Sequence, residues 1–161
     1  MMGKIAMLLV ALIAAGGAWA EASAFDEDVV ELERWYVGGA GTVVLPQGGA
    51  GMRRLGGASA RFGYYLTEFW AVEGEAAWLE NAAGLAAGAL WHWWGYERFD
   101  PFFTFGVRGW IRGDVGPKAG VGAFYHLTES LSLRFDADAT LALDGETAMV
   151  YSVSGGLQWS F

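Results

Sequence analysis

The sequence predicts an all-β fold, an eight-stranded antiparallel up-and-down barrel with short loops. Three observations predict it. Apolar and polar residues alternate with a period of two. The alternating segments run for about 9 to 12 residues, the length of tilted strands that cross a bilayer. Turn signals separate these segments, and no helical period persists after Arg34. The barrel is therefore expected to occupy residues 34–161.

The eight strands follow in order from the alternation. The first, WYVGGAGTVVL, alternates through glycines, and the second and third, ASARFGYYL and WAVEGEAAW, set aromatic and small residues against Arg and Glu. The fourth and sixth are predicted at 84–95 and 117–127, on either side of the fifth, FFTFGVRGWIR. The seventh and eighth, SLSLRFDADATLAL and MVYSVSGGLQWSF, alternate most regularly, and each therefore has one apolar and one polar face.

Turn signals occur between the strands. PQGGAG, ENAAG, RGDVGP and DGE follow the odd strands, and LTEF, YERFDP and LTES follow the even ones. The motif YYLTE at 64–68 returns as YHLTE at 125–129. Each copy ends an even strand, so we expect the same turn twice at one end of the barrel.

The N-terminal segment predicts export. Residues 1–20 contain Lys4, an apolar run and the A-x-A site Ala18-Trp19-Ala20, which indicates a cleaved signal peptide. A second cleavage site is Ala22-Ser23-Ala24. Residues 21–33 are acidic and are interpreted as a periplasmic leader.

Composition excludes several classes of site. The formal charge of −8 argues against nucleic acid as a partner, because its recognition needs a basic face. The chain has no cysteine, so it holds no disulfide and no thiolate metal site. Two histidines on different strands predict no metal site, glycine pairs without a following helix predict no dinucleotide loop, and no cofactor is expected.

The distribution of charge favours a membrane barrel over a soluble one. The apolar face is nearly free of charge and is too large to fill the inside of eight strands, so we expect it to face lipid. A closed barrel also satisfies the backbone in hydrocarbon. The polar face is then an interior ionic network, with the members Arg61, Glu73, Glu75, Arg108, Arg112, Lys118, Arg134, Asp136 and Asp138.

Four motifs resemble the eight-stranded outer-membrane barrels of the OmpA-type transmembrane domain and the opacity and OmpX proteins. They are WYVGGAG, GYYLTEFWAVEGE, FDPFFTFGVRG and the terminal GGLQWSF, and the resemblance covers residues 35–161. It implies an outer-membrane protein of a diderm bacterium. The alternation of Leu157, Trp159 and Phe161 is similar to the C-terminal signal that the barrel-assembly machinery recognises. The sequence departs from this family in two ways: no peptidoglycan-binding domain is expected after Phe161, and the outer loops are expected to be short.

Aromatic residues fall at the strand ends that the resemblance places in the periplasm. Such rings favour the membrane interface, so we predict a periplasmic aromatic girdle of Trp35, Tyr64, Trp70, Trp91, Trp93, Phe103, Tyr125 and Trp159, with Phe161 beside it. His92 and Trp94 are expected to face inward. Alanine in place of His92 is expected to leave folding nearly intact.

The functional expectation is a monomeric, porin-like barrel without catalytic residues, with a structural or envelope-stabilising role. Its partners are outer-membrane lipids and, transiently, the secretion and barrel-assembly machineries. Paired buried charges favour a closed interior. The alternatives are a narrow pore, a small-ligand or lipid pocket lined by Tyr36, Trp94, Trp110 and Phe124, and a lipid-A-modifying enzyme using His126 and Thr128.

Overall fold

The computed structural model describes residues 35–47, 55–93, 98–110, 115–143 and 148–161. The predicted signal peptide at 1–20, the acidic leader at 21–33, Trp94 and Arg112 lie outside these ranges. The described chain forms the strands β1 (Trp35–Gln47), β2 (Leu55–Tyr65), β3 (Trp70–Leu79), β4 (Ala82–His92), β5 (Phe99–Trp110), β6 (Val115–His126), β7 (Leu131–Ala142) and β8 (Ala148–Ser160). It holds no helix long and apolar enough to span a membrane.

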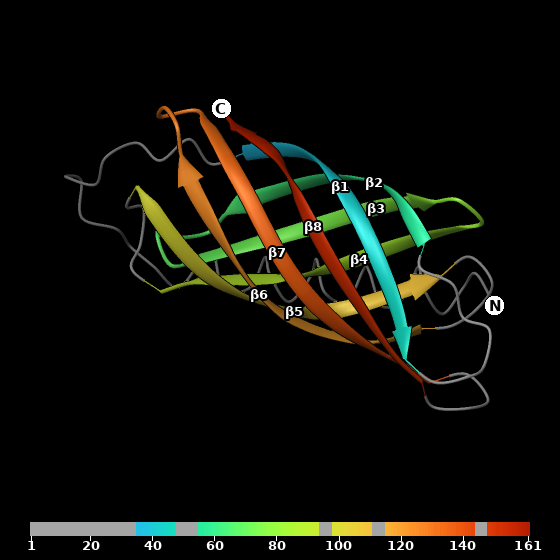
Figure 1. Cartoon of the computed structure of the whole chain (residues 1–161). Helices are drawn as coiled ribbons and strands as arrows, with labels where there is room; N and C mark the ends of the chain where they lie inside the picture. Colours follow the sequence, from blue (N-terminus) through green and yellow to red (C-terminus); the bar gives the residue numbers. More distant parts are fainter. Residues whose placement is uncertain (1–34, 48–54, 94–97, 111–114, 144–147) are drawn as a thin grey trace.

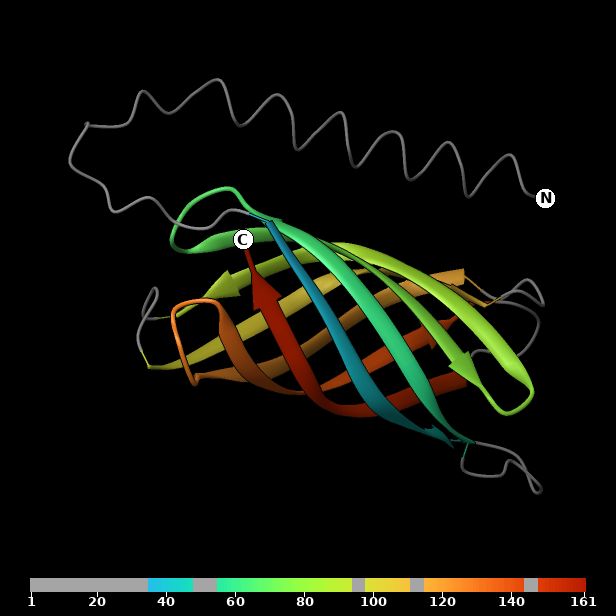
Figure 2. The same cartoon turned by 90° about the horizontal axis from the view of Figure 1, so that it is seen from above.

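The eight strands close into one barrel. Each strand pairs antiparallel with its neighbours along the chain, and β1 also pairs with β8. Figures 1 and 2 show the strands tilted and wound around a common axis. Closure leaves no strand edge unpaired along the barrel wall, which is how an up-and-down barrel avoids edge-to-edge association. The predicted fold class is confirmed.

The start of β1 and the end of β8 lie at the same end of the barrel, which we call the terminal end. The amide of Trp35 donates to the carbonyl of Phe161 at 3.2 Å, and the amide of Phe161 donates to the carbonyl of Trp35 at 2.8 Å. The turns at 66–69 and 127–130 lie at the same end, because each joins an even strand to the next odd one. We call the opposite end of the barrel the far end.

The two turns that carry the repeated LTE motif have the same hydrogen bonds. Leu66 N donates to Trp70 O, and Leu127 N donates to Leu131 O, both at 2.8 Å. In each turn the threonine hydroxyl accepts the amide of the following strand's first residue, at 3.1 Å for Thr67 and 3.0 Å for Thr128. The motif therefore forms one kind of turn twice, as the repeat predicts.

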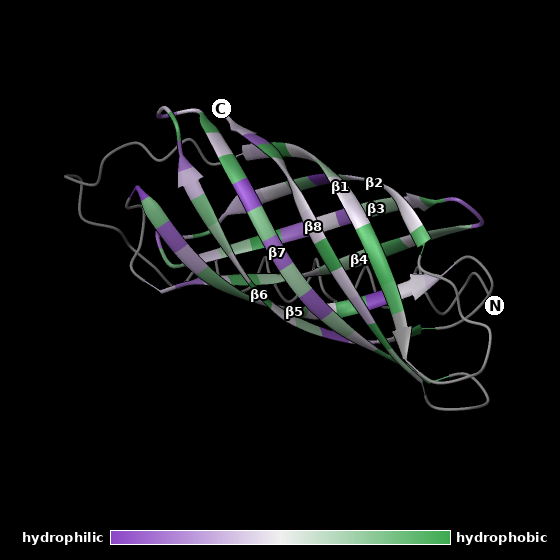
Figure 3. Ribbon diagram, viewed as in Figure 1, coloured by the Kyte–Doolittle hydropathy of each residue, from purple (hydrophilic) through white to green (hydrophobic). Residues whose placement is uncertain are grey.

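The strands present an apolar face outward and a polar face inward. Phe62 and Phe135 are 51% and 59% exposed, whereas Arg61 and Arg134 beside them in the chain are 5% and 3% exposed. Figure 3 shows hydrophobic and hydrophilic positions alternating along strands such as β7. A shift of one residue would exchange the two faces, so the alternation and the register support each other.

Inward glycines allow neighbouring strands to approach closely. Gly88 on β4 pairs with Gly106 on β5, and a methyl group at Gly106 would overlap the carbonyl of Ala87. At the outward Gly74 the nearest atom to an added methyl would be the Phe62 carbonyl oxygen, 3.9 Å away. Inward glycines at such contacts let the sheet bend sharply.

Several strands have bounds that differ from the predicted ones, and some include residues predicted as turns. β1 includes Pro46 and Gln47, β4 begins at Ala82 and ends at His92, and β5 begins at Phe99. β6 begins at Val115 and so includes Pro117, while β2 begins at Leu55. Pairing with at least one neighbouring strand holds each of these residues in the sheet, although Gly and Pro favour turns locally. The largest correction concerns residues 99–101, because it places Asp100 inside the barrel.

Candidate functional site: an ion-paired barrel interior

The interior of the barrel holds a network of buried charges. Eight of the nine residues predicted for it lie there, and Arg112 lies outside the described residues. Their side chains are at most 7% exposed. They come from five strands: Arg61 on β2, Glu73 and Glu75 on β3, Arg108 on β5, Lys118 on β6, and Arg134, Asp136 and Asp138 on β7.

Arg108 and Lys118 form one half of the network with the carboxylates of Glu75 and Asp138. Arg108 Nη1 lies 2.8 Å from Asp138 Oδ1, and Arg108 Nη2 lies 3.1 Å from Glu75 Oε2. Lys118 Nζ contacts the same two carboxylates at 3.0 and 3.3 Å. Ser152 on β8 accepts from Arg108 and donates to Asp138. Each cation is thus shared between two anions.

Arg61 connects this half with the other. Its Nη2 donates to Asp136 Oδ1 at 2.8 Å, and its Nε lies 3.9 Å from Glu75 Oε2 and 4.0 Å from Glu73 Oε1. One guanidinium therefore contacts carboxylates from both β3 and β7. The network continues across the barrel because of this residue.

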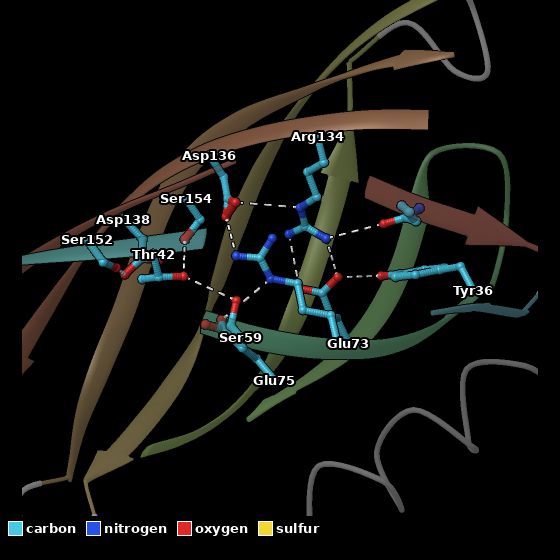
Figure 4. Close-up of polar contacts among 12 residues, drawn as sticks. Tyr36, Thr42, Ser59, Glu73, Glu75, Arg134, Asp136, Asp138, Ser152 and Ser154 are labelled. Carbon is cyan, nitrogen blue, oxygen red and sulfur yellow. Dashed lines mark hydrogen bonds and ion pairs between the residues drawn. The ribbon is translucent and has the colours of Figure 1, made fainter. Parts of the chain in front are cut away.

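Arg134 organises the half nearer the terminal end. It forms a bidentate ion pair with Glu73, in which Nη1 donates to Oε2 and Nη2 donates to Oε1 at 3.0 Å. Its Nε lies 3.6 Å from Asp136 Oδ2. The Tyr36 hydroxyl donates to Glu73 Oε2 at 2.9 Å. Figure 4 shows Arg134 beside Asp136 and Glu73, with Tyr36 approaching Glu73 from β1. The guanidinium also lies 4.9 Å from the ring centre of Phe102.

Neutral hydroxyls occupy the interior where β1, β2 and β8 meet. Thr42 Oγ1 lies 3.2 Å from Ser59 Oγ and 3.1 Å from Ser154 Oγ. These three side chains are at most 4% exposed. They hydrogen-bond to one another, whereas the charged groups of the network lie on β2, β3, β5, β6 and β7.

Among the described residues, the charges of the network balance. Four cations, Arg61, Arg108, Lys118 and Arg134, face four carboxylates, Glu73, Glu75, Asp136 and Asp138. Removing one member of such a buried set leaves an uncompensated charge, which is strongly destabilising. The arrangement can therefore hold the five strands together and can also occupy the space through which ions would pass.

A small cavity lies beside the network. Its volume is about 10 Å³, and it lies between Glu73, Glu75 and Lys118 on one side and the small residues of β4 and β5 on the other. That volume accommodates about one water molecule. The wall residues are Ala86, Gly88, Thr104 and Gly106.

Aromatic rings surround the terminal end on the outer face. Trp91 stacks on Trp93 at 6.0 Å and on Phe103 at 5.7 Å, and it meets Trp70 at 6.4 Å. The other predicted girdle residues are also on this face at the same end: Trp35 beside Tyr64 at 4.6 Å, and Tyr125 and Trp159, exposed by 39% and 59%. Trp35 is 44% exposed and therefore faces outward. Trp78 and Tyr151, both outward and exposed, lie toward the far end and were not predicted as a set.

Comparison with known proteins finds similarity in structure. A scan against protein-family models and a search of curated proteins gave no match. Among solved structures, Neisserial surface protein A superposes with a TM-score of 0.64 at 12% identity, covering 79% of this chain and 97% of that one. OprG of Pseudomonas aeruginosa superposes with a TM-score of 0.57 at 14% identity, covering 80% and 96%.

A designed transmembrane β-barrel is also similar, with a TM-score of 0.59 at 13% identity over 78% of this chain and 95% of that one. This fold is that of the eight-stranded outer-membrane barrels. The resemblance of the sequence to that class is confirmed at the level of fold. The designed barrel shows that the same architecture forms without any evolved function.

The C-terminal residues end the outer-membrane barrel fold on its apolar face. Leu157, Trp159 and Phe161 are 52%, 59% and 57% exposed, and all three point outward from β8 or directly after it. Gln158 and Ser160 between them are buried. The predicted assembly signal is thus presented on the outer surface, where another protein can contact it.

The barrel contains a second buried polar cluster, which the sequence pattern did not reveal. His92 Nδ1 lies 2.5 Å from Asp100 Oδ2, and His126 Nδ1 lies 2.7 Å from Ser132 Oγ. Asp100 was missed because RFDP was interpreted as a turn. Its position two residues before Phe102, in step with Thr104 and Arg108 on the inner face, was the signal that could have located it.

The structure changes the expectation for His92. The imidazole is 1% exposed and is paired with Asp100, which is 0% exposed. An alanine at this position would leave a buried carboxylate without its closest partner, so we expect a loss of stability.

Of the residues suggested for a small-ligand pocket, Trp94 lies outside the described residues, and Trp110 is not brought together with Tyr36 and Phe124. Tyr36 and Phe124 belong to the buried apolar cluster at the terminal end, with Tyr65, Ala71, Leu90 and Phe102. Trp110 ends β5 and therefore lies at the far end. Strand β5 runs the length of the barrel, which separates residues that share its inner face.

The residues suggested for catalysis also differ from expectation. Thr128 is exposed, and its hydroxyl accepts the amide of Leu131, whereas His126 contacts Ser132. Ser132 is 2% exposed and faces the barrel interior. Among the described residues, no group of three or more His, Asp or Glu side chains is placed to hold a metal ion.

Proposed function

We propose that the protein is an integral outer-membrane barrel with a structural, envelope-stabilising role and an interior closed by its ion pairs. The observation that carries this proposal is the balanced network of four cations and four carboxylates inside a barrel whose outer face is apolar. Lipid is the partner that this outer face fits. The monomer satisfies its own strand edges and needs no second chain for closure.

The ion pairs support a closed interior over a pore. Ions need a continuous hydrated path, whereas Arg61, Arg108 and Arg134 extend from different strands toward one another's carboxylates. The cavity beside Glu75 has the volume of about one water molecule. A narrow pore is the alternative function, because a rearrangement of these side chains would be enough to open one.

The proposed orientation places the terminal end in the periplasm. The repeated short turns at 66–69 and 127–130 and the exposed rings of Trp70, Trp91 and Trp159 support it, since aromatic rings favour the membrane interface. The proposal also includes export of the chain to the periplasm by the secretion machinery. The exposed Leu157, Trp159 and Phe161 are then available to the barrel-assembly machinery.

Conductance across a planar bilayer tests the closed interior. We expect the refolded protein to insert and to show no sustained current at neutral pH. Large, stable currents would contradict a closed interior and would favour the pore. Insertion is checked separately by the different gel mobility of boiled and unboiled samples, which distinguishes a closed barrel from a failure to insert.

Envelope permeability tests the physiological role. Deletion of the gene is expected to increase uptake of a dye that the intact outer membrane excludes, and expression of the wild-type chain is expected to reverse this. An enzymatic role in lipid-A modification instead predicts a change in the mass of lipid A on deletion. An unchanged permeability would contradict the structural role.

A further inference from the structure

The cavity beside the network lies at a row of residues that crosses four strands. In the strand register Glu73 on β3 pairs with Gly88 on β4, and Gly88 pairs with Gly106 on β5. Gly106 pairs in turn with Lys118 on β6. The two middle positions of the row have no side chain, which leaves room between the charged residues at its ends. All four residues line the cavity of about 10 Å³.

The two glycines of this row are required by the close approach of β4 and β5. A methyl group at Gly88 would overlap the carbonyl oxygen of Phe105, and a methyl group at Gly106 would overlap the carbonyl oxygen of Ala87. Neither position can therefore carry a side chain that fills the space. The cavity follows from the pairing of these two strands.

Two hydrogen-bond donors that line the cavity have capacity for a further hydrogen bond. The ammonium of Lys118 has three N–H donors, and among the described residues its ion pairs are with Glu75 Oε2 at 3.0 Å and Asp138 Oδ2 at 3.3 Å. One N–H group remains. Thr104 is 7% exposed, and within the described chain its hydroxyl forms no hydrogen bond with another side chain.

Two carboxylate oxygens beside the cavity have capacity for a further hydrogen bond as well. Each carboxylate oxygen can accept about two hydrogen bonds. From the described residues Glu73 Oε1 accepts one, from Arg134 Nη2 at 3.0 Å. Glu75 Oε1 likewise accepts one, from Arg108 Nη2 at 3.2 Å. Each of these two oxygens can therefore accept one more.

Charge and volume decide which molecule the cavity fits. The ammonium of Lys118 repels a cation, and the carboxylates of Glu73 and Glu75 repel an anion. A neutral molecule leaves the balance of the buried charges unchanged, which a buried ionic network requires. A volume of about 10 Å³ is close to the least that one water molecule needs, so nothing larger fits.

We propose that this cavity is a binding site for one water molecule, which accepts hydrogen bonds from Lys118 and Thr104 and donates to Glu73 and Glu75. A water molecule accepts two hydrogen bonds and donates two, which matches the two donors and two acceptors that have capacity left. Four partners are at the upper end of what a buried water molecule makes in proteins.

The proposed water molecule joins strands that the side chains of β4 cannot join. From Ala82 to Leu90 this strand has no polar side chain, so it contributes nothing to the network between β3 and β5. A water molecule over its glycine would connect Thr104 on β5 with Glu73 on β3 and Lys118 on β6. The inference rests on the proposed closed interior, because an open path would expose the same groups to bulk water.

Water-to-methyl NOE measurements test the site in the full chain, refolded in detergent micelles and labelled at its alanine and threonine methyl groups. We expect signals from long-lived water at the methyl groups of Thr104 and Ala86, which both line the cavity. The methyl group of Ala71, which is 0% exposed in the apolar cluster, is the control and should show none. Absence of the signal at both cavity methyl groups would overturn the proposal, as would an equal signal at Ala71.

A serine in place of Ala86 tests whether the signal comes from the cavity. The added hydroxyl occupies the cavity, so we expect the signal at the Thr104 methyl group to be lost. The matched control is Ala77→Ser, because Ala77 is 5% exposed on β3 but does not line the cavity. This variant should keep the signal. A signal that persists in Ala86→Ser, or that is lost equally in both variants, would overturn the assignment to a water molecule in the cavity.

A second pair of variants removes one partner of the water molecule and leaves the cavity open. Valine in place of Thr104 keeps the side-chain volume without the hydroxyl, so the signal at the Ala86 methyl group should weaken. Thr140→Val is the control, because Thr140 is 1% exposed and lies outside the cavity lining. Equal signals in these two variants would overturn the proposed set of partners. Unboiled gel mobility confirms that each variant is folded.

Conductance distinguishes failure of the water site from failure of the closed interior. A barrel that is closed but holds no water molecule at this site lacks the NOE signal and shows no sustained current. A barrel with an open path shows a sustained current, and its Thr104 methyl group should contact water in Ala86→Ser as well. Both outcomes would overturn the water site, and only the second would overturn the closed interior.

Discussion

Arg61 Nη2 on β2 lies 2.8 Å from Asp136 Oδ1 on β7, although β1 and β8 separate these two strands in the closed sheet. The contact therefore crosses the inside of the barrel. The cross-section of the barrel is therefore determined by the interior side chains as well as by the hydrogen bonds between neighbouring strands.

Replacing Arg61 with Met is expected to lower the free energy of unfolding by about 3–5 kcal/mol, because Asp136 then keeps a buried charge with only a longer contact to Arg134. The measurement is urea unfolding in vesicles, followed by tryptophan fluorescence. The double variant Arg61→Met with Asp136→Leu should recover part of this loss. A double variant that is as unstable as the sum of the single ones would show that the two residues act independently.

The outer face of β7 provides a test of membrane depth. Phe135 is 59% exposed in the middle of the strand, and Leu131 begins it at the terminal end. Arginine in place of Phe135 is expected to cost about 2–4 kcal/mol, whereas arginine in place of Leu131 should cost about 0–1 kcal/mol, since a charge near the interface reaches water. Unfolding from vesicles measures both, and equal costs would contradict a membrane boundary near Leu131.

Gly106 on β5 and Gly74 on β3 are expected to respond differently to alanine. Gly106 faces inward against the carbonyl of Ala87, so the variant Gly106→Ala forces the strands apart and should destabilise the barrel by about 1–3 kcal/mol or more. Gly74 faces outward, with 3.9 Å to the nearest atom, so Gly74→Ala should be tolerated. The fraction with unboiled gel mobility after refolding measures the difference. Similar behaviour of the two variants would refute the role assigned to the close approach.

Phe161 is expected to matter more for assembly in cells than for stability. Its side chain is 57% exposed, and its link to Trp35 is through the backbone. The variant Phe161→Ala should therefore refold into vesicles nearly as well as the natural chain but accumulate less in the outer membrane, as measured by fractionation and immunoblot. Val153→Ala, also outward on β8 and 51% exposed, is the matched control. An equal loss for both variants would remove any special role for the last residue.

Much of the fold could be predicted because alternation with a period of two is a direct record of which side of the sheet a residue faces. Leu131 to Leu141 illustrate this, since their apolar and polar faces match the outer and inner faces of β7. The partners of the charges could not be predicted in the same way. The pairing of Arg61 with Asp136 depends on the tilt and closure of the barrel, which parity along one strand does not contain.

Asp100 shows where local signals mislead. Pro101 beside it and Gly95 before it indicate a turn, yet pairing with Phe124 on β6 holds Asp100 in β5. The parity of Phe102, Thr104 and Arg108 extends to Asp100 and would have placed it inside. The prediction of a turn at Asp100 was therefore wrong, because it relied on local turn propensity and not on the alternation along the strand.

The pairing of Trp35 with Phe161 makes closure of the barrel depend on residues from both ends of the described chain. β1 and β8 are the strands most distant in sequence, and the contact between Thr42 and Ser154 joins residues 112 positions apart. Such separation slows closure, because a long loop must be ordered before the contact forms. β1 lacks one of its two neighbours until β8 is available, so the wall closes only after all eight strands are present.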